Sequence, residues 1–321
     1  MKGMELSKAY YKEFGEPMLR EQFPGVLPYL ATGLFGSGSE CFGFDDDVSR
    51  DHDFEPGFCL FLPGEDVIDR RTAFALERAY AKLPKEFGGL KRSLTQPVGG
   101  PRHGVIRTAE FFQEKIGASD GILTVGQWLT VPENALAEAV NGEIFSDGYG
   151  EVTRIRENLR QYPEDVRRKR LAGQLLLAAQ SGQYNYRRCL AHGEPAAAQL
   201  AVNEFVKAAI SAIFLLNRVY EPYYKWSFRA LRALPKLSLD AELLEYLLVT
   251  GNDTEPADEF TPAAAESKAD VIESIAADLI DELQDQELTK AICGDLEKHA
   301  YSVNDSIEDS GVRNLHILAA V

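Results

Sequence analysis

Residues 31–62 read ATGLFGSGSECFGFDDDVSRDHDFEPGFCLFL, and this stretch decides the fold that we expect. The apolar run 31–35 predicts a short strand that ends at a glycine-serine turn, residues 36–39. The run 53–62 predicts a second, central strand after an acidic loop. Asp51 and Asp53 are two positions apart, so on a strand both carboxylates point to the same face. The stretch therefore predicts two strands of one sheet with a turn and a pair of acids between them.

The paired aspartates and the turn suit a magnesium-bound triphosphate. Magnesium prefers oxygen ligands in near-octahedral geometry, which two carboxylates and phosphate oxygens can supply. Gly38 and Ser39 would offer backbone N–H groups and a hydroxyl to the terminal phosphates. The alternative is a solvated acidic turn, because residues 45–47 are all aspartate. That alternative explains neither the glycine-serine turn nor the apolar residues after Asp53.

Two common phosphate-binding patterns are absent from this stretch. A dinucleotide fingerprint G-x-G-x-x-G that starts at Gly36 needs glycine at position 41, where the chain has Cys41. No Gly-Lys-Ser/Thr follows the turn, which excludes a P-loop. What remains is a strand, a Gly-Ser turn and Asp-x-Asp after 11 residues counted from Ser39, or 13 from Ser37.

This spacing resembles the signature of the nucleotidyltransferase superfamily, which includes DNA polymerase beta and kanamycin nucleotidyltransferase. The phrases GSGSECFGFDDDVSRDHDF and WSFRALRALP are similar to a bacterial branch of that superfamily, the proteins with a DUF4037 domain. RENLRQYPEDV, QYNYRRC and YEPYYKW extend the likeness over most of the chain. The resemblance implies an α+β protein. We expect a nucleotidyltransferase-fold mixed-sheet domain at 1–148 and an all-α helical-bundle domain at 149–321, with an acidic linker at 251–262.

The resemblance also implies an activity. The expected reaction moves a nucleoside monophosphate, in the first instance AMP from ATP, to an acceptor hydroxyl or phosphate, with two magnesium ions. Asp51 and Asp53 would be catalytic and bind the metal. The nucleotide-binding residues would be Gly36, Ser37, Gly38 and Ser39, with Lys225 from the second domain.

The third carboxylate is where this chain departs from the family. Members usually carry an acid on a neighbouring strand, which binds metal or takes the proton of the acceptor. The strand expected at 105–109 has Arg107 instead. We therefore expect Glu110, at the end of that strand, to be the catalytic base, with Glu143 and Asp147 as further candidates.

Composition bears on the acceptor. The chain has 34 basic and 50 acidic residues, a net charge of -16, which disfavours non-specific binding to nucleic acid. A small-molecule acceptor is therefore favoured. The alternatives are transfer to RNA or protein, as in toxin systems, and a nucleotide-binding regulator without catalysis, which applies if no third acid completes the set.

The second half of the chain predicts helices at 171–181, 196–220 and 237–249, and a last helix whose apolar stripe packs on the bundle. The basic run 154–170 is either a solvated, ion-paired face or a patch for triphosphate or RNA. The aromatic run 220–226 either stacks a base or forms a packed corner. Four scattered cysteines and no apolar run of about 20 residues predict a reduced, cytoplasmic protein without a membrane span.

Overall fold

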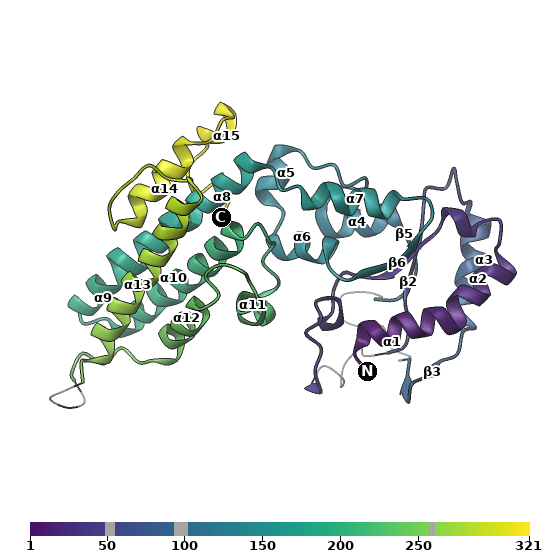
Figure 1. The fold of residues 1–321 in the computed structure, drawn as a ribbon, viewed down its shortest axis with the longest axis horizontal. Helices are drawn as coiled ribbons and strands as arrows, with labels where there is room; N and C mark the ends of the chain where they lie inside the picture. The colour runs from purple at the N-terminus through teal and green to yellow at the C-terminus, as the bar shows by residue number, and fades with distance from the viewer. Residues whose placement is uncertain (49–54, 93–101, 257, 259–260) are drawn as a thin grey trace. The chain divides into compact units, whose positions relative to one another are not determined.

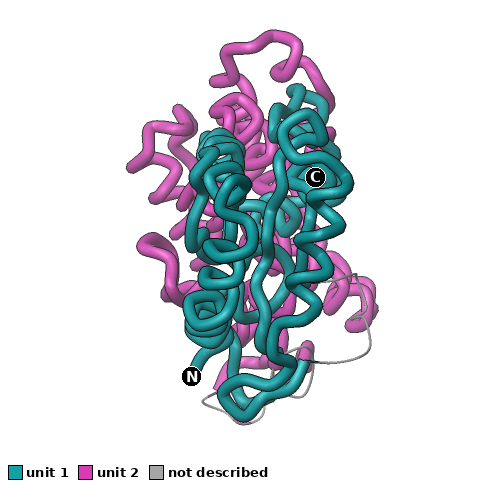
Figure 2. Tube along the Cα trace, turned by 90° about the vertical axis from the view of Figure 1, so that its right-hand side faces the viewer, with its two compact units in different colours: residues 1–127, 131–161 teal, residues 128–130, 162–321 magenta. Residues whose placement is uncertain are grey.

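The computed structural model describes residues 1–48, 55–92, 102–256, 258 and 261–321. The predicted α+β class is confirmed, because a small mixed sheet in the first part of the chain is followed by helices alone. The chain forms two compact units (Figure 2). The first contains residues 1–127 and 131–161, and the second contains residues 128–130 and 162–321. The domain boundary expected after residue 148 thus lies within the first unit's residues.

Four strands form the sheet of the first unit (Figure 1). They are β1 (Ala31–Leu34), β2 (Cys59–Leu62), β5 (Gly104–Arg107) and β6 (Glu143–Asp147), in the order β5-β2-β1-β6. β1 is antiparallel to β2 and β6, whereas β2 is parallel to β5. Gly33 pairs with Cys59 and Leu34 with Glu143. The end of β1 that leads into the glycine-serine turn therefore lies beside the first residues of β2 and β6.

Three details of the sheet differ from the sequence expectation. Residues 55–58 are not in a strand, because Pro56 has no N–H for a ladder and Gly57 weakens one. Thr108 and Ala109 begin a helix and do not extend β5. β6 was not predicted at all. Asp51 and Asp53, the acids expected on the second strand, lie outside the described residues.

The helical segments of the first unit cover a core rich in aromatic rings. Tyr10, Tyr11 and Tyr80 contact Phe58 at ring centroid distances of 5.0–6.2 Å. Residues 3–22 form a helix whose middle turn, Tyr11–Gly15, is π-helical. These elements are α1 (Gly3–Tyr10), the π-helical turn Tyr11–Gly15, α2 (Glu16–Gln22), α3 (Arg70–Ala81), α4 (Thr108–Ile116), α6 (Glu133–Val140) and α7 (Glu151–Arg160), with a hairpin of β3 (Glu86–Phe87) and β4 (Leu90–Lys91). α5 (Val125–Thr130) lies where the residues pass from the first unit to the second.

The second unit is a bundle in which α8 packs against α10 and α14, and α13 packs against α10 and α12. The apolar stripe of the last predicted helix is buried on α13 at Ile272, Ile275, Leu279, Ile280 and Leu283, which confirms that it packs on the bundle. The helices are α8 (Glu164–Ala178), continued by the π-helical segment Ala179–Tyr186, α9 (Arg187–Ala191), α10 (Pro195–Leu216), α11 (Tyr224–Leu231), α12 (Asp240–Val249), α13 (Ala264–Asp285), α14 (Leu296–Asp305) and α15 (Ser310–Arg313).

Within the described residues, α10 alone has the length and composition of a membrane-crossing helix. Its most apolar window is 61% buried inside the structure. Residues such as Phe205, Ile213 and Phe214 are fully buried against neighbouring helices. Such burial is typical of a core helix of a bundle.

Candidate functional site

The glycine-serine turn, residues 36–39, is held in a backbone conformation that needs glycine. Gly36 and Gly38 have φ angles of +110° and +126°, which L side chains rarely adopt. A Cβ atom at Gly38 would also lie only 2.4 Å from Oε1 of Glu40. The turn therefore presents its backbone without side chains at these two positions, as an anion-binding turn requires.

Asn141 fastens one side of the turn. The N–H of Gly36 donates to Oδ1 of Asn141, and Nδ2 of Asn141 donates to the carbonyl of Gly36, both at 2.8 Å. Behind Asn141 is Arg156, a buried α7 residue whose guanidinium donates to the carbonyls of Val140 and Asn141. Burial and the charge of nearby Arg160 lower the pKa of Arg156 to about 10. Arg156 thus fixes the end of α6, and the two hydrogen bonds of Asn141 fix the position of Gly36 relative to it.

A three-group network fastens the other side. The hydroxyl of Ser37 donates to Oε2 of Glu138 at 2.8 Å, and Nζ of Lys115 donates to both groups at 2.7 Å. The side chains of Lys115 and Glu138 are only 17% and 18% exposed. Lys115 is in the last turn of α4, and Glu138 is on α6. Lys115 therefore places a positive charge of the first unit beside the turn. Lys225, the lysine that the sequence predicts to bind the nucleotide, belongs to the second unit.

Two buried acids follow the turn directly. Glu40 is 7% exposed, its Oε2 lies 3.5 Å from the hydroxyl of Ser39, and its Oε1 has no hydrogen-bond partner. Asp45 is 9% exposed; its Oδ2 accepts from the N–H of Gly3 at 2.9 Å, and its Oδ1 has no partner. Burial raises the pKa of Glu40, and the charges of His103 and Arg102 oppose this.

Residues that enter β2 and β5 meet at the same edge of the sheet as the turn. Nδ1 of His103 is 3.6 Å from Oε1 of Glu55, and both side chains are largely buried. A Cβ atom at Gly57 would lie 2.7 Å from the His103 ring, so glycine permits this close approach. Because Cys59 pairs with Gly104, these two loops are adjacent. The turn, Glu40 and His103 therefore belong to one end of the first unit.

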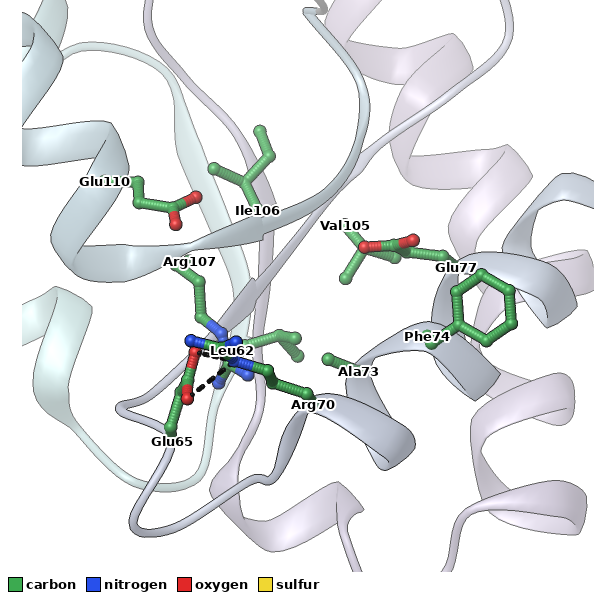
Figure 3. A pocket seen from close by; sticks show the side chains of 10 residues that line it. All are labelled: Leu62, Glu65, Arg70, Ala73, Phe74, Glu77, Val105, Ile106, Arg107 and Glu110. Carbon is green, nitrogen blue, oxygen red and sulfur yellow. Dashed lines mark hydrogen bonds and ion pairs between the residues drawn. The ribbon is translucent and has the colours of Figure 1, made fainter.

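Glu110, the predicted base, lies elsewhere on α4. It is an exposed residue of the first helical turn, which follows the end of β5 where Arg107 pairs with Leu62. It lines a cavity of about 310 Å³, in which Arg107 reaches toward Arg70 and Glu65 (Figure 3). The last turn of the same helix brings Lys115 to Ser37. Glu110 thus lines this cavity, and its role as the catalytic base stays a prediction.

The other two acidic candidates are at opposite ends of β6. Glu143 pairs with Leu34 beside the turn, and its carboxylate forms an ion pair with Lys8. Asp147 pairs with Ala31, and its carboxylate accepts the N–H groups of Gly150 and Thr153 at 2.8 Å, at the start of α7. Of these two, Glu143 lies at the edge of the turn, and Asp147 is a helix-capping residue.

Lys225 and the aromatic run lie on and before α11 in the second unit. Tyr220 is buried and its ring centroid is 5.1 Å from that of Tyr162, as a packed corner predicts. Tyr223, Tyr224 and Lys225 are exposed, and Nζ of Lys225 is 5.0 Å from the Trp226 ring centroid. The packed interpretation thus applies to Tyr220, whereas base stacking by the exposed rings and nucleotide binding by Lys225 stay predictions.

The basic run 154–170 is mostly structural, which neither sequence interpretation anticipated. Arg156, Arg167, Lys169 and Arg170 are buried. Arg167 donates to the carboxylate of Glu164 and to a backbone carbonyl, and Lys169 donates to three acceptors near the C-terminus. These four cations are therefore not part of a solvated face and do not form an open patch for RNA.

In the described ranges, no three His, Cys, Asp or Glu side chains are grouped as a metal site. The acids predicted to bind magnesium, Asp51 and Asp53, lie outside those ranges. Cys41 and Cys59 are buried, and burial raises their pKa values, that of Cys59 to about 12. Both are therefore neutral thiols and poor metal ligands. Glu40 is a described acid beside the turn whose Oε1 has no hydrogen-bond partner.

Comparisons with known proteins give two relationships. Residues 128–227 match the family model of a domain of unknown function, DUF4037; the match runs from the second half of α5 to the first half of α11 and does not include the glycine-serine turn. Among solved structures, a nucleotidyltransferase-like protein from Exiguobacterium sibiricum 255-15 is similar, with 13% identity and a TM-score of 0.38. The alignment covers 92% of this chain and 81% of that one. The chain has no match among curated proteins.

Proposed function

We propose that this protein is a magnesium-dependent nucleotidyltransferase. The observation that carries the proposal is the turn at residues 36–39, which presents glycine backbone at the end of a buried strand. Hydrogen bonds with Asn141, Lys115 and Glu138 fasten it. A turn fixed in this way binds phosphate without reorganisation, and preorganised donors are the main source of catalysis in phosphoryl and nucleotidyl transfer.

In the proposed reaction, an oxygen of the acceptor attacks the α-phosphorus of the nucleotide, in the first instance ATP. The new bond joins that oxygen to the α-phosphorus, the bond to the bridging oxygen breaks, and pyrophosphate leaves with the electron pair. The acceptor proton passes to water or to an acid of the site. Magnesium, held by Asp51 and Asp53, supplies charge neutralisation at the phosphates.

The residues around the turn have separate tasks in this proposal. The N–H of Gly38 and the hydroxyl of Ser39 contact the β and γ phosphates. Lys115 offsets phosphate charge, since its ammonium is held next to Ser37. Lys225 of the second unit is proposed as a further phosphate contact, because it is exposed and carries one of the positive charges of α11. Asn141 positions the backbone of Gly36.

A small-molecule acceptor is the favoured substrate class. The net charge of -16 opposes the approach of a polyanion. The burial of Arg167, Lys169 and Arg170 supports the same choice, because these side chains satisfy internal acceptors and are not available to RNA phosphates. Transfer to RNA or protein is the alternative, and it predicts labelled macromolecules in the experiment below.

The test incubates the purified protein with magnesium, labelled ATP, GTP, CTP or UTP, and cell extract. We expect one or more labelled products and pyrophosphate release, both abolished by Asp51→Ala with Asp53→Ala. Asp46→Ala with Asp47→Ala is the matched control, since it removes two exposed acids from the same loop. Equal labelling by the wild type and the Asp51/Asp53 variant contradicts the proposal. ATP binding without any product indicates a nucleotide-binding regulator.

A further inference from the structure

Glu40 combines burial with a carboxylate oxygen that has no partner. The residue is 7% exposed, and Oε1 makes no hydrogen bond. Its other oxygen has only a long contact, 3.5 Å, to the hydroxyl of Ser39. Native proteins rarely leave a buried polar atom unsatisfied, because the loss of its hydration costs free energy. A buried carboxylate without hydrogen-bond partners is stabilised when it binds a proton, a water molecule or a cation.

The turn is built to make room for this carboxylate. A Cβ atom at Gly38 would lie 2.4–2.7 Å from the three atoms of the Glu40 carboxyl group. Glycine at this position therefore does more than permit a φ of +126°, since it also lets the carboxylate lie against the backbone. The acid and the proposed phosphate-binding backbone are thus in contact. A carboxylate there would repel phosphate unless a cation lay between them.

A second buried acid lies near Glu40. Burial raises the pKa of Glu40; a hydrogen bond from its own backbone N–H and the charges of His103 and Arg102 lower it, and the charge of Asp45 raises it further. Asp45 is itself 9% exposed and has its own unpartnered oxygen, Oδ1. Its second oxygen is used, since Oδ2 accepts from Gly3 at the start of α1. Two buried acids of one short loop therefore each have a free oxygen, and a cation relieves the repulsion between them.

We propose that Oε1 of Glu40 is a ligand of the divalent cation that accompanies a nucleoside triphosphate at residues 36–39. The inference rests on the proposed function for its nucleotide. Magnesium in nucleotide sites is commonly held by one or two carboxylates together with phosphate oxygens and water, so one protein oxygen at this place is sufficient. Glu40 would thereby supply an acid directly beside the turn.

The experiment measures metal binding to the full chain. Mn²⁺ is titrated in the presence of a non-hydrolysable ATP analogue, and free Mn²⁺ is followed by electron paramagnetic resonance. We expect Glu40→Gln to weaken Mn²⁺ binding by about tenfold or more, the size typical of damage to a metal site. Glu114→Gln is the matched control, because it removes an exposed acid from α4 and should leave the affinity unchanged.

Thermal unfolding gives a second readout. A ligand that binds only the folded state raises the unfolding temperature, so magnesium with the analogue should stabilise the wild type and Glu114→Gln. The rise should be lost in Glu40→Gln. Glu40→Asp keeps the charge and withdraws the oxygen by one methylene, and we expect it to weaken binding while the chain stays folded. It tests the inference even if Glu40→Gln does not fold.

Equal Mn²⁺ affinity in the wild type, Glu40→Gln and Glu40→Asp would overturn the inference, because the free oxygen would then hold a proton or water. The outcome is separable from the proposed function. If the Asp51/Asp53 variant abolishes labelling and Glu40→Gln changes neither labelling nor affinity, the transferase assignment stands and the role of Glu40 is rejected. If labelling does not depend on Asp51 and Asp53, the assignment fails, and Mn²⁺ binding still decides the role of Glu40.

Discussion

The two units bury charge in different ways. In the second unit, the buried ammonium groups of Lys169 and Lys268 each donate to three acceptors, and the guanidinium of Arg167 pairs with Glu164. In the first unit, the buried carboxylates of Glu40 and Asp45 each keep an oxygen without a partner. Both arrangements remove charge from water, but the cost is offset by several internal partners at Lys169, Lys268 and Arg167 and not at Glu40 and Asp45.

The difference distinguishes buried charges that stabilise the fold from buried charges that we propose to bind a ligand. A buried ion with a full set of partners stabilises one packing arrangement, and its removal leaves those partners unsatisfied. A buried ion without a partner destabilises the protein when no ligand is bound. Such ions are found mainly at functional sites. The comparison therefore predicts opposite signs for substitutions in the two units.

The largest effect is expected for Lys169→Met. The change leaves the side chain of Asn304 and the carbonyls of Arg313 and Leu315 without their donor. We expect the free energy of unfolding to fall by about 3–5 kcal/mol, because three buried acceptors lose a charged hydrogen-bond donor. Urea denaturation followed by circular dichroism measures it. Lys207→Met, an exposed position on α10, is the control, and an equally small loss in both variants would refute the structural role.

Glu164 makes the second unit sensitive to acid. Burial raises the pKa of its carboxyl, but hydrogen bonds and charges from Arg167 and Arg218 lower it more, to about 2. A folded-state pKa below the ordinary value means that stability is fully present above about pH 4.5 and is lost as the pH falls toward 2. Urea midpoints measured across this range should fall in the wild type. Glu164→Gln should be less stable near neutral pH and should lack this part of the pH dependence.

Asp240 is the exception that can break the comparison, because it is a buried acid of the second unit. It is 4% exposed, its Oδ2 has no partner, and burial together with Asp278 raises its pKa to about 7. A raised acid pKa means that its contribution favours the folded state at low pH and is lost as the pH rises through 7. We expect Asp240→Asn to raise the free energy of unfolding at pH 8 by about 1–2 kcal/mol. No gain at pH 8 relative to pH 5 would contradict this account.

Glu40→Gln tests the first unit. In metal-free buffer the amide replaces an unsatisfied buried carboxylate, so the free energy of unfolding should rise by about 1 kcal/mol. Asp45→Asn should gain less, because Oδ2 of Asp45 already accepts from the first helix. Chemical denaturation in the presence of a chelator measures both. A loss of stability like that of Lys169→Met would show that Glu40 has a structural partner.

The smallest effect is expected for Glu110→Gln. Glu110 is exposed and lines the cavity beside Arg107. We expect a change in stability within about 0.5 kcal/mol, as for ordinary surface substitutions. Nucleotide labelling tests its predicted role: lost labelling with unchanged stability would support Glu110 as the base, and unchanged labelling would contradict it.

Short-range sequence patterns predicted those strands and helices whose formation depends on neighbouring residues. The strand at 31–35, the helix at α3 and the long helices of the bundle follow from apolar periodicity and turn residues. β6 was missed because its five residues, EIFSD, are short, only partly buried and surrounded by helical composition. Its flanking Gly142 and Gly148 were the available signal.

The neighbours of the turn could not be predicted for a different reason. Lys115, Glu138 and Asn141 contact residues 36 and 37 across 78, 101 and 105 positions of sequence. No periodicity reports such separations. Glu40 was missed although it follows Ser39 directly, because burial distinguishes it from the solvated acids of the same loop, and burial is a property of the fold.

The link between Asn141 and Gly36 constrains how this protein can evolve. Glu138 and Asn141 lie inside the DUF4037 match, whereas the turn that they hold lies outside it. A recombination event that exchanged residues 128–227 alone would separate the turn from its supports. The two segments must therefore be inherited together, and changes at Asn141 should be tolerated only with compensating changes around Gly36.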